Sequence, residues 1–145
     1  MHQMDEIGRL MAQILTLYEQ WAKQQGLNYN TLAVLYVLAT EGRRTQKQIG
    51  ESWHLPKQTV FSICRQLKEQ GYVDFAQDNP DKREKSVFLT DSGQAYAQPF
   101  AEKMRALENA AFARFGVREA QQLITELRRL ADLLNEAMSS AGTEV

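Results

Sequence analysis

Residues 45–90, TQKQIGESWHLPKQTVFSICRQLKEQGYVDFAQDNPDKREKSVFLT, decide how this chain folds. Thr45 and Gln48 have the spacing of a capping box, in which each side chain bonds the other residue's backbone at the start of a helix. Pro56 suits the first turn of a second helix, because a missing N–H costs nothing there. Apolar residues then recur at helical spacing and predict one buried stripe, made of Val60, Ile63, Cys64 and Leu67. Gly71 ends that helix. Helices this short are stable only when packed together, so the pattern predicts a helix-turn-helix.

The residues after Gly71 alternate as they do in a β-hairpin. Val73 and Phe75 share one side of a strand, and Val87 and Leu89 repeat the pattern further along the chain. Between them, residues 78–85 read DNPDKREK, which combines turn-forming residues with positive charge. A helix-turn-helix followed by such a hairpin, or wing, predicts a module that binds double-stranded DNA.

This segment resembles the winged-helix domain of the MarR family of bacterial regulators. The similarity lies in Gly71-Tyr72-Val73, Asp78-x-x-Asp81-x-Arg83 and Leu89-Thr90-x-x-Gly93, and with the flanking helices it extends over roughly residues 5–138. The resemblance implies a mainly α fold with a small β-wing, and a short strand at Arg43-Arg44 against the wing. We expect a winged helix-turn-helix domain in residues 28–90, a helical dimerisation region in residues 5–25 and 91–138, and a loose C-terminal tail in residues 139–145.

The distribution of charge favours a nucleic-acid partner more than its sum does. The 145 residues carry a net charge of −1, which by itself argues against DNA binding. Residues 43–68, however, hold six basic residues and one acid, or +5, so the rest of the chain carries −6. This asymmetry predicts one positive face on an acidic body. The alternative is that solvated helices happened to collect cations.

Several classes of protein are disfavoured by what the sequence contains. No apolar run approaches the ~20 residues of a membrane span, and the N-terminus lacks the layout of a signal peptide. A single cysteine forms no internal disulfide, so a cytoplasmic protein is expected. We find no glycine-rich phosphate loop, nucleophile elbow or paired metal-ligand motif. We therefore expect no enzyme activity, no cofactor and no metal site.

The first and last helices carry long apolar faces. The first is lined by Ile7, Leu10, Met11, Ile14, Leu15, Leu17, Tyr18 and Trp21, and the last by Ala120, Leu123, Ile124, Leu127, Leu130, Ala131, Leu134 and Met138. A domain of some 60 residues cannot cover both faces. Burial against a second copy predicts a two-fold homodimer, and intramolecular pairing of the two helices is the alternative.

The helix that begins at Pro56 is expected to lie in the major groove of a near-palindromic operator. Candidate base contacts are Lys57, Gln58, Ser62 and Arg65, because these side chains match the hydrogen-bonding edges of the bases. Candidate phosphate contacts are Thr45, Gln46 and Thr59. At the wing tip we expect Arg83, helped by Lys82 and Lys85, to reach the minor groove. A solvated charged turn is the alternative for the tip.

The resemblance also implies a repressor that a small aromatic or anionic effector releases from DNA. Five aromatic residues are candidates to line an effector cleft, and they fit a plain core equally: Tyr18, Trp21, Tyr36, Trp53 and Phe100. Cys64 lies on the buried stripe, where an inert role competes with a redox-responsive one. A winged helix that binds protein rather than DNA is the remaining alternative.

Overall fold

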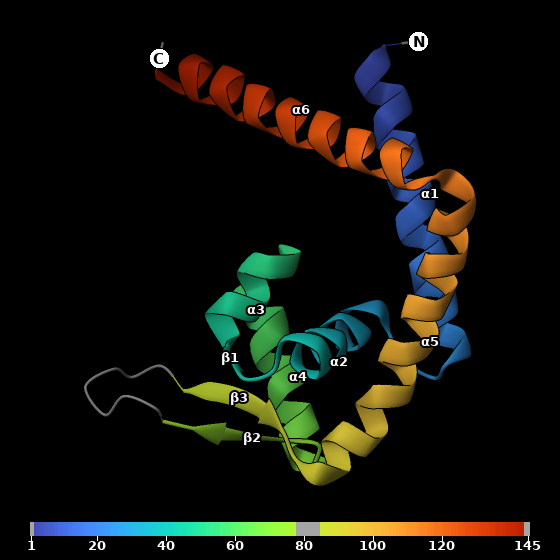
Figure 1. Ribbon diagram of the computed structural model, residues 1–145. Helices are drawn as coiled ribbons and strands as arrows, with labels where there is room; N and C mark the ends of the chain where they lie inside the picture. Colours follow the sequence, from blue (N-terminus) through green and yellow to red (C-terminus); the bar gives the residue numbers. More distant parts are fainter. Residues whose placement is uncertain (1, 78–84, 144–145) are drawn as a thin grey trace. The chain divides into compact units, whose positions relative to one another are not determined.

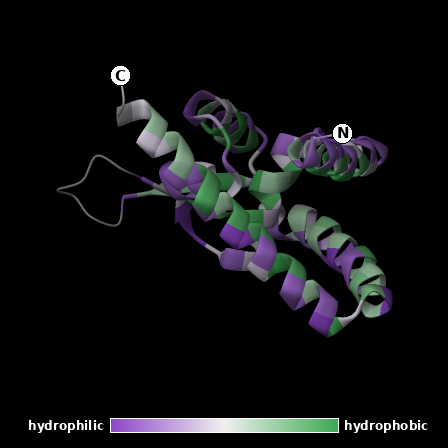
Figure 2. Ribbon diagram, turned by 90° about the horizontal axis from the view of Figure 1, so that it is seen from above, coloured by the Kyte–Doolittle hydropathy of each residue, from purple (hydrophilic) through white to green (hydrophobic). Residues whose placement is uncertain are grey.

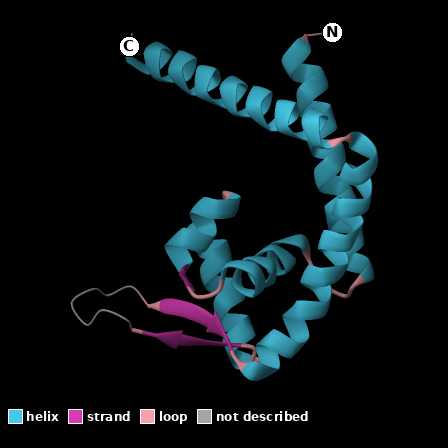
Figure 3. Ribbon diagram, in the orientation of Figure 1, coloured by secondary structure: helices cyan, strands magenta, loops and turns pink. Residues whose placement is uncertain are grey.

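The computed structural model describes residues 2–77 and 85–143. Its elements follow the order α1 (Gln3–Gln24), α2 (Tyr29–Glu41), β1 (Arg44–Thr45), α3 (Gln46–Trp53), α4 (Lys57–Glu69), β2 (Val73–Ala76), β3 (Ser86–Leu89), α5 (Asp91–Phe115) and α6 (Val117–Thr143) (Figure 1). The chain forms two compact units, Met1–Lys103 and Met104–Val145. The expected mainly α fold with a small β-wing is confirmed (Figure 3).

The helix-turn-helix forms as its local sequence predicts. The capping box closes at the start of α3, where the Gln48 N–H donates to Thr45 Oγ1 at 3.1 Å and the Thr45 N–H donates to Gln48 Oε1 at 2.9 Å. His54 ends α3 in the left-handed region, with a φ of 51°. The chain then turns through Leu55, and Pro56 precedes the first residue of α4.

The hydrophobic core of the first unit lies under α4. The expected stripe of Val60, Ile63, Cys64 and Leu67 is buried, with 7% or less of each residue exposed. It packs with apolar residues of α2, of α3 and of the strands, including Val34, Leu35, Val37, Leu38, Ile49, Val73 and Val87. Burying the inner face of α4 in this way leaves the opposite face of the helix in solvent.

The wing is a three-stranded antiparallel sheet in the order β1-β3-β2. Val73 pairs with Leu89 and Phe75 with Val87, so the alternating apolar residues of the two strands are paired with each other. β1 pairs with β3, but it spans Arg44–Thr45 rather than Arg43-Arg44. The shift places the strand directly before the first residue of α3. Asp78, Asp81, Lys82 and Arg83 at the wing tip lie outside the described residues.

A tight junction joins the wing to α5. The Thr90 hydroxyl donates to the Gly71 carbonyl at 2.6 Å and accepts the Gly93 N–H at 3.0 Å. The Thr90 N–H donates to the Tyr72 carbonyl at 3.0 Å. The Tyr72 ring stacks on Tyr96 of α5, with 4.2 Å between the ring centroids. These contacts fix the path of the chain from the base of the wing into α5.

The long helices expose apolar side chains. In α1, Leu10, Met11, Ile14, Leu15 and Leu17 are between 42% and 58% exposed, and in α6 Leu123, Ile124 and Leu127 are between 44% and 52% exposed. In Figure 2, hydrophobic residues recur between hydrophilic ones along α6, the helix that leads to the label C. Within the described residues, no helix is long and apolar enough to cross a membrane.

The expected C-terminal tail is shorter than the sequence suggested. α6 continues past Met138 to Thr143, so residues 139–143 are helical rather than loose. Ser139, Ser140 and Ala141 carry no backbone constraint that stops a helix, and a glycine such as Gly142 costs only about 1 kcal/mol in a helix.

Candidate DNA-binding surface

The solvent face of α4 carries the residues expected to contact bases. Lys57, Gln58, Ser62 and Arg65 are all exposed. The Arg65 side chain is 73% exposed and its Nε lies 3.6 Å from Glu69 Oε1, in an ion pair open to solvent. Such a pair contributes little, so Arg65 can leave Glu69 for another partner at little cost. The burial of the opposite stripe thus aims these side chains outward together.

A groove of about 1060 Å³ runs between α3, the start of α4 and the wing. Its apolar lining residues are Leu55, Pro56, Phe61 and Phe75. Among the described residues, three lysines (Lys47, Lys57 and Lys85) and one acid (Glu51) line it, and their charges sum to +2. Such a positive channel fits the phosphate backbone of a nucleic acid.

This groove brings together Thr45, Gln46, Lys57 and Lys85 from three separate segments. Thr45 Oγ1 accepts the cap bond from Gln48, and its hydroxyl hydrogen can still be donated to a phosphate oxygen. Lys47 also lines the groove. Lys47 belongs to the basic stretch 43–68, but it was not among the candidate DNA contacts predicted from the sequence.

An ion pair ties the wing to the end of α4. Lys68 Nζ lies 2.6 Å from Asp74 Oδ1 and 5.2 Å from the centroid of the Phe75 ring. The hydrogen bond from Lys68, followed by the bond from the Phe75 N–H, lowers the pKa of the Asp74 carboxyl. The carboxylate is therefore charged at neutral pH, and it holds the base of β2 beside the helix.

The five aromatic candidates for an effector cleft do not form one cluster. Tyr36 and Trp53 contact each other edge to face, with centroids 6.1 Å apart. Tyr18 instead contacts Tyr29 at 6.3 Å, and Phe100 contacts Tyr96 at 5.2 Å. Trp21 is half-buried on α1.

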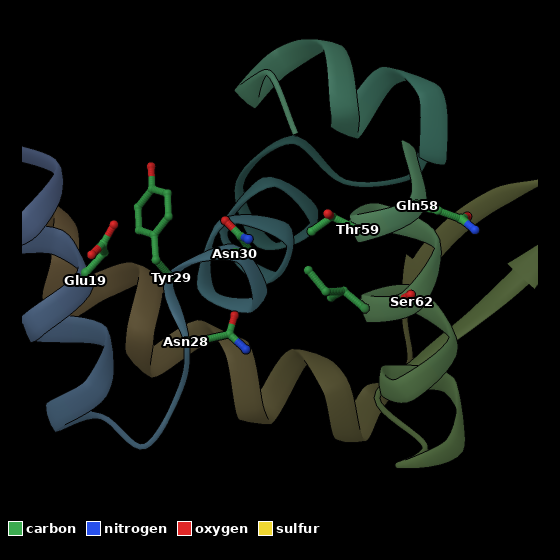
Figure 4. Close-up of a pocket in the computed structure, with 8 residues that line it drawn as sticks. Glu19, Asn28, Tyr29, Asn30, Gln58, Thr59 and Ser62 are labelled. Atoms are coloured by element: carbon green, nitrogen blue, oxygen red, sulfur yellow. The ribbon is translucent and has the colours of Figure 1, made fainter. Parts of the chain in front are cut away.

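A second cleft, of about 540 Å³, lies on the other flank of α4. It is lined by Glu19 of α1, by Asn28, Tyr29 and Asn30 at the start of α2, and by Gln58, Thr59, Ser62 and Ile63 of α4. Figure 4 shows Glu19 and Tyr29 on one side, Thr59 and Ser62 on the other, and the two asparagines between them. Burial, and then the charge of Glu19, raise the pKa of Tyr29, so its phenol stays protonated. Sequence reasoning picked out Gln58, Thr59 and Ser62 of this set, as DNA contacts.

Cys64 is fully buried, and burial raises the pKa of its thiol to about 12. At pH 8 its thiolate fraction is therefore ~1,000-fold below that of a free thiol. We expect iodoacetamide to label native protein at pH 8 only through unfolding, while protein in urea reacts at once. Mass spectrometry of timed samples measures both rates. Rapid labelling of native protein, coupled to a loss of DNA binding, would restore the redox alternative.

The matching proteins agree with this geometry. The model of the MarR family matches residues 25–84. The structure of NMB1585, a MarR family regulator from Neisseria meningitidis, superposes with a TM-score of 0.89 at 41% identity, over 97% of this chain and 99% of that one. The HTH-type transcriptional regulator SarZ of Staphylococcus aureus (strain USA300) is 27% identical over 80% of this chain and 77% of its own. A structure of Staphylococcus aureus MepR bound to DNA shares the fold, with a TM-score of 0.72 at 20% identity over 92% of this chain and 99% of MepR.

The capped helix pair, the exposed face of α4 and the three-stranded sheet define a winged helix-turn-helix protein. With the similarity to NMB1585 along nearly its whole length, the chain belongs to the MarR family of transcription regulators.

Proposed function

We propose that this protein is a DNA-binding repressor, and not an enzyme, that acts as a homodimer in the cytoplasm. The observation that carries the proposal is the exposed polar face of α4 beside a groove lined by three lysines. The groove would hold a phosphate backbone while Lys57, Gln58, Ser62 and Arg65 reach base edges in the major groove. Thr45, Gln46 and Thr59 would contact phosphates, and Lys82, Arg83 and Lys85 the minor groove. MepR, which shares this fold, has been solved in a complex with DNA, and this supports DNA as the partner.

The exposed apolar faces of α1 and α6 support the homodimer. Leu10 and Ile14 of α1 are more than half exposed, and Leu123 and Leu127 of α6 are almost half exposed. Burying these side chains at a two-fold interface would stabilise the dimer by roughly 25 cal/mol for each Å² of apolar surface removed from water. A symmetric dimer would bind a near-palindromic operator with half-sites about one helical turn, or ~10 bp, apart.

Release by a small-molecule effector completes the proposed mode of action. The aromatic pair Tyr36 and Trp53 is the part of the sequence-based candidate set that lies together. The buried, protonated thiol of Cys64 disfavours the redox alternative. The lysines around the groove disfavour a module that binds only protein, because such a module needs no positive channel.

Selection of bound sequences from a random pool of DNA duplexes tests the proposal. We expect a two-fold motif, bound by a species whose mass in sedimentation equals two chains. Enrichment of a single, non-symmetric half-site by a one-chain species would contradict the dimer. Equal retention of all sequences would contradict specific reading by α4.

Lys85 borders the groove, directly precedes the first residue of β3 and is exposed. In the variant Lys85→Ala, one positive charge is lost beside the minor groove, where it would attract the DNA backbone whatever the base sequence. We therefore expect all DNA sequences to bind more weakly by a similar factor. The slope of log affinity against log salt concentration should shrink by ~1. Fluorescence anisotropy at several salt concentrations measures this slope. Lys103→Ala, which removes an exposed lysine of α5 remote from the groove in sequence, serves as the control and should leave the slope unchanged.

A further inference from the structure

The second cleft has the size of a ligand site. Its volume of about 540 Å³ lies in the range of small-molecule sites. Its walls come from α1, α2 and α4, which all belong to the unit Met1–Lys103. It flanks α4 through Thr59 and Ser62, whereas the lysine-lined groove meets the same helix at Lys57 and Phe61.

The lining of this cleft selects the charge of a ligand. Glu19 is its one charged residue among those described, and the other polar groups are amides, hydroxyls and the Tyr29 phenol. No lysine, arginine or histidine is among the described residues that line it. A carboxylate ligand would find no opposite charge here and would be repelled by Glu19, while a cation would be attracted. Ile63, which is only 7% exposed, adds a small apolar surface to the lining of the cleft.

We propose that this cleft binds a small organic cation, a protonated primary amine with a compact apolar body. The ammonium group would pair with the Glu19 carboxylate and with the amide oxygen of Asn30, and the body would extend over Ile63 toward Thr59 and Ser62. This charge is opposite to that of the anionic effector which the family resemblance implies. An occupied cleft covers Thr59 and Ser62, so the amine and DNA would compete. That consequence rests on the proposed DNA-binding function, whereas amine binding itself does not.

Three probes of one shape test the selection of charge: benzylamine, benzyl alcohol and benzoate. We expect benzylamine to bind with a Kd on the order of 1 mM, as suits a ligand of its size. The alcohol and benzoate should bind at least about tenfold more weakly. Shifts of the side-chain amide NMR signals of Asn28 and Asn30 report occupancy of this cleft. Benzoate binding as tightly as benzylamine would overturn the proposal, and so would benzylamine shifts confined to residues outside the cleft.

Two variants with opposite expected effects test the role of charge within the cleft. Glu19→Gln removes the carboxylate and should weaken benzylamine binding about fivefold, the loss expected for an exposed ion pair. Asn30→Asp adds a second carboxylate and should strengthen binding. It lies in the first turn of α2, where an acid is favourable, so folding should not suffer. Glu6→Gln removes an acid from the same helix as Glu19 and should leave benzylamine binding unchanged. Unchanged binding in both cleft variants would overturn the proposal.

Competition with DNA is measured separately, with a selected DNA duplex at constant ionic strength, because benzylammonium is itself a salt. At tenfold its Kd, benzylamine should weaken DNA binding by the wild-type protein about tenfold, and benzyl alcohol should not. If benzylamine occupies the cleft and DNA affinity does not change, the proposed competition with DNA is contradicted, whereas the proposed amine site is supported. If no duplex binds even without amine, the proposed function fails, and the NMR titration still decides the site.

Discussion

Gly93→Ala should unfold the winged-helix unit at a temperature well below that of the wild-type protein. A Cβ atom at position 93 would overlap the carbonyl oxygen of Tyr72 and come within 2.7 Å of its carbonyl carbon. Both are backbone atoms, so no flexible side chain can move aside. We expect a loss of more than about 3 kcal/mol in the free energy of unfolding, at the upper end of what overpacking costs. For a chain of this length that loss lowers the melting temperature by on the order of 10 °C.

The cost is large because the carbonyl of Tyr72 is already in use. It accepts the Thr90 N–H at 3.0 Å, and the Tyr72 ring stacks on Tyr96. Moving the carbonyl away from a new methyl group would break the bond to Thr90 and shift the stacked ring. The wing and α5 would then separate at their junction.

Gly142→Ala is the matched control, because a Cβ atom there meets nothing within 4 Å. It should change the free energy of unfolding by less than about 1 kcal/mol. Urea unfolding followed by circular dichroism, at one fixed protein concentration, compares the two variants with the wild-type protein. Equal stability of Gly93→Ala and Gly142→Ala would show that the junction relaxes around the added methyl.

Gly93 also illustrates what the sequence could and could not reveal. The motif Leu89-Thr90-x-x-Gly93 was recognised from its resemblance to a family, but no local pattern explains the glycine. A glycine is required because a Cβ atom would overlap the backbone of Tyr72. Tyr72 is distant along the chain and directly precedes β2. By contrast, the stripe of Val60, Ile63, Cys64 and Leu67 and the Thr45 cap depend on spacing within one helix, and both were predicted correctly.

The same distinction applies to the candidate sites. The outward residues of α4 could be predicted, because burial of one helical face determines which residues lie on the other. The second cleft could not, because Glu19, Asn30 and Ser62 come from three helices and share no motif. The contact between Lys68 and Asp74 joins a helix to a strand and was missed for the same reason. The end of α6 was misjudged because a helix without a stop signal can continue through weakly helical residues.

Arg65→Ala should lower affinity for the selected operator and relax its sequence preference. Arg65 is 73% exposed on the outer face of α4, where its guanidinium can donate two hydrogen bonds to a guanine. Loss of such a contact costs about 1–3 kcal/mol, or roughly 5- to 150-fold in Kd. The loss should be confined to operators that carry the contacted base pair. A repeat of the random-pool selection with the variant should therefore show one position per half-site with a weakened preference.

Arg129→Ala provides a closely matched control for the loss of an arginine. Arg129 lies on α6, is 70% exposed and pairs with Glu126 at 3.1 Å, much as Arg65 pairs with Glu69. Both variants lose one positive charge and one solvent-exposed ion pair, so general electrostatics and helix stability change alike. Only Arg65→Ala should alter the selected motif, because a phosphate contact weakens all sequences equally while a base contact does not. If Arg65→Ala weakens every duplex by one common factor and keeps the wild-type motif, Arg65 contacts the phosphate backbone, and the reading of bases must then rest on Lys57, Gln58 and Ser62.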